Sequence, residues 1–98
     1  MSLPFVYRAE VRDEIDQAYA RYDRQRQGLG EEFLTALQRQ LDLIGQNPEM
    51  YAELYRRVRG APMRRFPYVV YYRIQTDRIE VIAVQHGSRH SRRWRRRS

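Results

Sequence analysis

The sequence contains no cysteine, so disulfides, thiolate catalysis and cysteine-ligated zinc are excluded. Long apolar stretches are missing as well: the longest uninterrupted run, Tyr68 to Tyr72, is far too short to cross a bilayer. The chain does not open with a basic segment followed by an apolar one, as a secretory signal would. We therefore expect a cytoplasmic protein with no membrane partner.

Lysine is also absent: all 19 basic residues are arginine. The net charge of the chain is +7. Arginine keeps its proton at any working pH and offers a planar fork of donors to carboxylates or phosphates. Acids are scarce in one half only: residues 1–55 carry six Arg against ten Asp and Glu, whereas residues 56–98 carry thirteen Arg against two. The basic second half indicates an anionic partner, either nucleic acid or an acidic protein segment.

The size of the chain allows one small domain. With 98 residues, of which 42% are hydrophobic and 32% charged, it is too apolar to be disordered and long enough for one modest core. We expect a single domain over residues 1–98, in which residues 89–98 form an arginine-rich C-terminal tail.

Two amphipathic helices are predicted after a short edge strand at Leu3–Tyr7. In the first, Ala9–Gln27, apolar residues recur at helical spacing, and acids precede arginines in the order that the helix dipole favours. Gly28-Leu29-Gly30 breaks this helix, and the second runs from Gly30 until Asn47-Pro48 ends it. So short a link makes the two helices an antiparallel hairpin.

After Pro48 the apolar residues alternate with a period of two. Residues 51–60 form either a loop or the start of a strand, and strands are predicted at Met63–Phe66, Val69–Ile74 and Ile79–Gln85. The predicted fold is α+β, with an antiparallel sheet packed against an N-terminal two-helix hairpin in the order β-α-α-β-β-β.

A four-residue turn at 75–78 sets the register of the last two strands. It pairs Ile74 with Ile79, Arg73 with Glu80, Tyr72 with Val81 and Tyr71 with Ile82. The opposite charges of Arg73 and Glu80 support this register. One face, expected beneath the helices, then carries Val70, Tyr72, Ile74, Ile79, Val81 and Ala83, and the other carries Val69, Tyr71, Ile82 and Val84.

That second face is largely apolar, whereas a sheet face in contact with water should be polar. We expect either the C-terminal segment or another chain, such as a second copy in a homodimer, to cover it. The tail has one tryptophan, Trp94, among the arginines Arg92, Arg93, Arg95, Arg96 and Arg97. Trp94 is expected to anchor residues 89–94 on the apolar face, while residues 96–98 fray.

The order and spacing of several short motifs resemble the RelE/ParE toxin superfamily of bacterial toxin–antitoxin modules. The motifs are GLGEEF at 28–33, NP at 47–48, VR at 58–59, RFPYVVYY at 65–72 and AVQH at 83–86, followed by Arg89 and Trp94. The ending is more similar to the ParE branch than to the RelE branch. One departure is that His90 follows Arg89 where ParE-like members commonly have proline.

The resemblance implies a toxin that is neutralised by a cognate antitoxin protein wrapped around it. ParE-type toxins are associated with inhibition of DNA gyrase, and RelE-type toxins cut messenger RNA on the ribosome. The ParE-like ending favours a gyrase-binding toxin, with a ribosome-dependent endoribonuclease as the alternative. A non-toxic basic nucleic-acid-binding domain is a second alternative.

The residue types favour binding over catalysis. Cutting RNA without a metal needs a general base, a general acid and cations near the phosphate. Arginine does not readily give up its proton, and lysine is absent. The resemblance to RelE-type toxins implies a late catalytic tyrosine, and this sequence has Trp94 at that position. An endoribonuclease would have to use His86 with Arg59, Arg65 and Arg89.

No cofactor or metal is expected, and no catalytic residue is assigned in the preferred interpretation. The residues predicted to bind the partner or target are Arg57, Arg59, Arg64, Arg65, Tyr71, Arg73, Ile82, Arg89, Arg92, Arg93 and Trp94.

Overall fold

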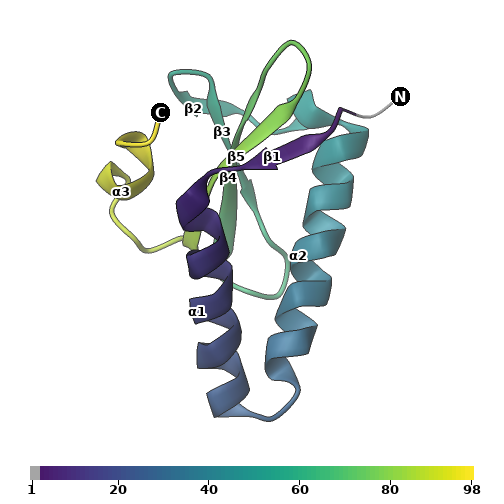
Figure 1. Ribbon diagram of the computed structural model, residues 1–98, viewed down its shortest axis with the longest axis vertical. Helices are drawn as coiled ribbons and strands as arrows, with labels where there is room; N and C mark the ends of the chain where they lie inside the picture. Colours follow the sequence, from purple (N-terminus) through teal and green to yellow (C-terminus); the bar gives the residue numbers. More distant parts are fainter. Residues whose placement is uncertain (1–2) are drawn as a thin grey trace.

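The protein is described by a computed structural model that covers residues 3–98 (Figure 1). Two helices, α1 (Ala9–Gln25) and α2 (Leu29–Gln46), form a hairpin that covers one face of a five-stranded sheet. A short helix near the C-terminus, α3 (Arg92–Arg95), packs on the opposite face. The α+β class and the helical hairpin predicted from the sequence are confirmed. No helix within residues 3–98 combines the length and the apolar character that spanning a membrane requires.

The link between α1 and α2 is set by one carboxylate and two glycines. Gly28 has a φ of 90°, a left-handed conformation that glycine adopts without strain. The Asp23 side chain accepts hydrogen bonds from the backbone N–H groups of Gly28 (3.0 Å) and Gly30 (3.1 Å) and so caps the start of α2. Gly30 lies so close to Tyr19 that a Cβ would approach its ring at 2.8 Å, which lets the two helices pack tightly.

The sheet has the strand order β1-β5-β4-β3-β2. Its strands are β1 (Phe5–Tyr7), β2 (Glu53–Tyr55), β3 (Val58–Pro62), β4 (Tyr68–Ile74) and β5 (Ile79–His86). The sheet is mixed, because β1 lies parallel to β5 while the other pairs are antiparallel. A turn of 3-10 helix, η1 (Pro48–Met50), connects α2 to β2.

The predicted strand at Met63–Phe66 is wrong. Strand β3 ends at Pro62, and the chain then turns through Arg65, whose φ is 69°. Met63 and Phe66 are both buried although they lie in this loop. Their apolar side chains led to the prediction of a strand. The segment left open between loop and strand, residues 51–60, contains β2 and the beginning of β3.

The register of β4 and β5 is confirmed for its first three pairs only. Beyond Tyr72 the ladder shifts, so that Tyr71 pairs with Ala83 and not with Ile82. This β-bulge turns both Ile82 and Ala83 toward the α3 side and returns Val84 to the helix side. The predicted places of Ala83 and Val84 are therefore exchanged.

Two separate clusters of buried side chains result. The larger one lies between the helical hairpin and the sheet and includes an aromatic group formed by Tyr22, Phe33, Phe66 and Tyr68. The smaller one lies between the other face of the sheet and α3, and it contains Val58, Tyr71, Ile82, Ala83 and Trp94. The smaller cluster holds the C-terminal segment in place.

Candidate functional site

Trp94 anchors the C-terminal segment on the second face of the sheet, as predicted. Its side chain is 3% exposed and stacks on Tyr71, with ring centroids 4.6 Å apart and planes 18° apart. Burial raises the pKa of Tyr71 above its usual value. The apolar face is therefore covered by this chain itself, and Tyr71, Ile82 and Trp94 lie beneath the surface. A partner that touches these three residues has to displace α3.

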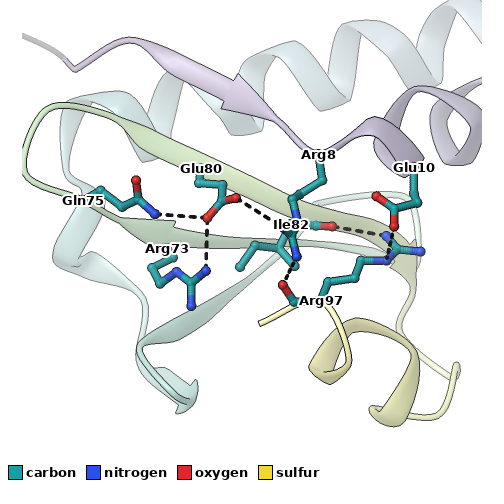
Figure 2. Close-up of polar contacts among 7 residues, drawn as sticks. All are labelled: Arg8, Glu10, Arg73, Gln75, Glu80, Ile82 and Arg97. Carbon is teal, nitrogen blue, oxygen red and sulfur yellow. Dashed lines mark hydrogen bonds and ion pairs between the residues drawn. The ribbon is translucent and has the colours of Figure 1, made fainter.

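Arg97 fastens the end of this segment, as the close-up in Figure 2 shows. Its guanidinium donates to the backbone carbonyl of Ile82 (3.1 Å) and lies 3.9 Å from Glu10. It also lies 2.9 Å from Glu14, which the figure does not draw. The carbonyl of Arg97 accepts a hydrogen bond from the Arg8 side chain. The expectation that residues 96–98 fray is wrong for Arg97, because Glu14 of α1 and the Ile82 carbonyl of β5 bind its guanidinium at a partly buried position.

Glu14 joins three elements at this point. Its carboxylate accepts hydrogen bonds from the backbone N–H of Val84 (3.0 Å) and from Nε2 of Gln85 (2.8 Å), in addition to its ion pair with Arg97. Helix α1, strand β5 and the C-terminal segment thus share one acceptor, which places α3 relative to the sheet.

Arg8 continues the polar network toward the β4–β5 turn (Figure 2). It pairs with Glu80 (3.6 Å), and the same Glu80 carboxylate accepts from Arg73 (3.1 Å) and from Gln75 (3.2 Å). Arg73, predicted to bind the partner, is therefore engaged within the sheet.

The exposed arginines of α3 lie beside the turn between β2 and β3. Arg56 and Arg95 both place their guanidinium groups against the ring of Tyr55, at 5.3 Å and 4.8 Å from its centroid. Tyr55 in turn packs edge-on against Trp94 (6.3 Å). We call the exposed arginines of this turn, Arg56 and Arg57, together with Arg92, Arg95 and Arg96 of α3 and its C-cap, the arginine face.

An open hollow of about 400 Å³ lies on the arginine face. Its lining consists of Tyr55, His90, Ser91, Arg92, Arg95 and Arg96. Five of these side chains are polar or charged, and guanidinium groups already cover the ring of Tyr55. The hollow is therefore suited to an anion and not to an apolar ligand.

The remaining predicted basic residues lie elsewhere. Arg59 donates to the backbone carbonyls of Tyr51 (2.6 Å) and Glu49 (3.2 Å) and so holds η1 against the sheet. Arg64 and Arg65 lie in the β3–β4 loop and line a hollow of about 530 Å³ beside α2. Arg65 and Arg26 both bind Glu32, and their hydrogen bonds lower the pKa of that carboxyl group. The predicted binding residues are therefore not gathered on one surface: Arg64 and Arg65 lie beside α2, whereas Arg89 and Arg93 line a cleft beside α1.

The four residues of the endoribonuclease alternative are not brought together. His86 and Arg89 line one cleft beside α1, but Arg59 and Arg65 do not reach it. Nδ1 of His86 lies 2.7 Å from the Ser88 hydroxyl and accepts the Ser88 N–H at 3.1 Å. Among residues 3–98, no three His, Asp or Glu side chains group closely enough to hold a metal ion.

Sequence reasoning missed Glu14, Tyr55, Arg56, Arg95 and Arg97 as members of this region. Glu14 stands among other acids on the polar side of α1, so nothing in the pattern distinguishes it. The adjacent arginines at 56–57 were a signal, since a basic pair between two short polar segments is typical of an exposed turn. Their conformation was not foreseeable, because such turns usually contain asparagine or glycine.

The chain matches one protein family by sequence and has the same fold as a solved structure. Residues 5–91 match the family described as the ParE toxin of the type II toxin–antitoxin system parDE. No curated protein sequence matches the chain significantly. Among solved structures, the chain is similar to one described as the chromosomal ParDE TA system from P. aeruginosa, with a TM-score of 0.76 and 13% sequence identity. The match covers 87% of this chain and 96% of that one.

Proposed function

The chain belongs to the ParE toxin family of type II toxin–antitoxin systems, and from this membership we propose that it is a toxin that binds and inhibits DNA gyrase. The activity requires neither a cofactor nor a metal, and its place of action is the cytoplasm.

The observation that carries this proposal is the separation of the groups that RNA cleavage would need. The best general base, His86, is hydrogen-bonded to Ser88. Arg59 and Arg65 form hydrogen bonds elsewhere, Arg59 to the backbone next to η1 and Arg65 to Glu32 of α2. General acid–base catalysis requires its groups within hydrogen-bond reach of the reacting atoms. A protein without such a cluster, but with arginines exposed on a fixed surface, is suited to act by binding.

The second part of the proposal is an antitoxin partner. The solved chain with the same fold is described as part of a ParDE TA system, which supports a partner of that kind here. An acidic antitoxin segment, disordered when free, would fold over the basic surface and block it. Buried apolar area would add to this binding where the segment displaces α3 from Tyr71 and Ile82; contacts with the exposed arginines alone would weaken as salt rises.

The test is a gyrase supercoiling assay with the purified chain, run beside an in vitro translation assay. We expect supercoiling to be inhibited in proportion to toxin concentration, translation to continue, and the cognate antitoxin to restore supercoiling. The variant His86→Ala serves as the control and should inhibit gyrase as well as the unmodified chain.

The opposite pattern would replace this proposal with the endoribonuclease alternative. Cleavage of ribosome-bound message by the unmodified chain, lost in His86→Ala, would show that the protein is an enzyme. Gyrase activity that stays unchanged at every toxin concentration would remove gyrase as the target.

A further inference from the structure

We infer that the arginine face is a binding site for the phosphodiester backbone of duplex nucleic acid, and in particular for DNA. This inference goes beyond the proposed target, because it assigns a ligand to specific residues and can be measured with no gyrase present.

The first observation is that the arginine face has cations without acidic partners. Eight other arginines of the chain form ion pairs with Asp or Glu. Within residues 3–98, none of the five arginines of the arginine face has a carboxylate oxygen of Asp or Glu within 4.0 Å. Their charge is therefore available to a ligand, and phosphate oxygens match the donor fork of arginine.

The second observation is strain in the β2–β3 turn. Tyr55 pairs with Val58, so only Arg56 and Arg57 form the turn, and their φ angles are 48° and 67°. Two-residue hairpin turns with positive φ at both positions favour asparagine and glycine, because a side chain there costs about 1–2 kcal/mol per residue. Arginine at both positions lowers the stability of the turn and places two cations at the tip of the hairpin. Strain of this kind points to a function for the strained residues.

The third observation is that two of these cations, Arg56 and Arg95, are held in position before any ligand arrives. The Arg56 and Arg95 guanidinium groups lie on the Tyr55 ring, which packs on the buried Trp94. Beyond the other end of α3, Arg97 is held by its ion pair with Glu14 and by its hydrogen bond to the Ile82 carbonyl, the second of which Figure 2 shows. Side chains that are already ordered lose less conformational entropy on binding.

The aromatic rings near the arginine face are covered, and this indicates which kind of polyanion can bind there. Single-stranded nucleic acid binds through bases stacked on exposed aromatic rings, and protein partners need an accessible apolar anchor. Tyr71 and Trp94 are 7% and 3% exposed, and the ring of Tyr55 is covered by guanidinium groups. Apart from Leu54 of β2, which is 52% exposed, the arginine face therefore offers charge and hydrogen bonds, which is how proteins hold a duplex backbone without reading its sequence.

The experiment measures binding of a fluorescein-labelled DNA duplex by anisotropy, at several salt concentrations between about 50 and 200 mM. Two variants remove two charges each from the arginine face: Arg92→Gln with Arg96→Gln, and Arg56→Asn with Arg57→Gly. The matched control, Arg24→Gln with Arg39→Gln, removes two charges from exposed positions on α1 and α2 that form no ion pair within residues 3–98. Circular dichroism checks that each variant is folded.

We expect each arginine-face variant to bind DNA roughly tenfold more weakly and to lower the slope of log K against log salt by about 2, since each phosphate contact adds close to one unit. The control should bind as the unmodified chain does. The Asn-Gly variant should also unfold at higher temperature, because it relieves the strained turn. This variant keeps the test valid should the α3 variant fold poorly.

Three results would overturn the inference. The first is an equal loss in the control, which would mean that only the net charge matters. The second is tighter binding of a single strand than of a duplex. The third is variants that keep full DNA affinity while losing affinity for the antitoxin, which would identify the arginine face as a protein-binding surface. Gyrase inhibition is scored separately, so its failure leaves the DNA result unaffected.

Discussion

Replacing Glu14 by Gln should release the C-terminal segment before the rest of the protein unfolds. In the folded protein the Glu14 carboxylate accepts from Val84 and Gln85 and pairs with Arg97. The amide of glutamine keeps the shape and one acceptor oxygen, but it removes the charge and places an NH2 group where an oxygen now accepts. The lost charge weakens the pair with Arg97, which holds the C-terminal segment, while one acceptor oxygen remains for the contacts with β5.

The size of the effect follows from burial. The side chains of Glu14 and Arg97 are each only 17% exposed, and they lie 2.9 Å apart. A charge-assisted hydrogen bond in such a setting contributes about 1.5–3 kcal/mol, and we expect the docking free energy of the C-terminal segment to fall by this amount. Glu10→Gln is the matched control, because Glu10 is 54% exposed and lies 3.9 Å from Arg97. Such an exposed pair contributes about 0.2–1 kcal/mol.

The single tryptophan of the chain makes docking of α3 measurable. Trp94 is buried, so its emission reports whether α3 lies on the sheet, while far-ultraviolet circular dichroism reports mainly α1 and α2. In urea the two signals should change together for the unmodified chain and for Glu10→Gln. In Glu14→Gln the emission of Trp94 should change at a lower urea concentration than the dichroism, and acrylamide should quench it faster without denaturant.

Two outcomes would refute the role given to Glu14. One is coincident transitions in Glu14→Gln with midpoints equal to those of the unmodified chain. The other is a shift in Glu10→Gln as large as that in Glu14→Gln, which would mean that the general charge of α1, and not the buried pair, retains the C-terminal segment.

Two further predictions concern stability. Gly30→Ala should destabilise the fold by about 1–3 kcal/mol in urea titrations, because its Cβ would lie 2.8 Å from the Tyr19 ring and 2.9 Å from the Tyr19 carbonyl oxygen; an unchanged midpoint would contradict this close approach. Burial raises the pKa of Tyr72, whose hydroxyl donates to the Pro48 carbonyl, from 10.0 to about 12. The folded state then holds this proton more tightly than the unfolded state, so its contribution is complete below pH 10.0 and is lost between there and about pH 12, by up to about 1.4 kcal/mol per pH unit. Tyr72→Phe should flatten this part of the stability profile, and an equally steep profile in that variant would assign the loss to other groups.

Much of the fold was predictable because its signals are local. The helical hairpin follows from apolar spacing and from Gly28 and Gly30, and the β4–β5 register follows from the facing charges of Arg73 and Glu80. The bulge that separates Tyr71 from Ile82 was not predictable, because alternation with a period of two contains no sign of an extra residue. Strands β2 and β3 were also missed as a pair, since the arginines between them lack the usual turn residues.

The functional region was predictable in composition but not in arrangement. The position of Trp94 over the apolar face follows from the need to cover that face. The roles of Arg59, Arg65 and Arg73 depend on partners in η1, α2 and β5, and no local pattern shows that these arginines are engaged and not free. Arg97 is the same case, since its partner Glu14 is distant in sequence.

The strand order also determines when during synthesis this protein can become folded. Strand β1 leaves the ribosome first, yet its hydrogen-bonding partner in the sheet is β5, the last strand to emerge. The hydrogen bond from the Arg8 side chain to the carbonyl of Arg97 likewise forms only after Arg97 has been added to the chain. Strands β2, β3 and β4 can pair with one another before β5 is made, but β1 has no partner in the sheet until β5 has emerged. A chain whose translation stops before β5 would therefore lack the β1–β5 pairing and the α3 arginines of the arginine face.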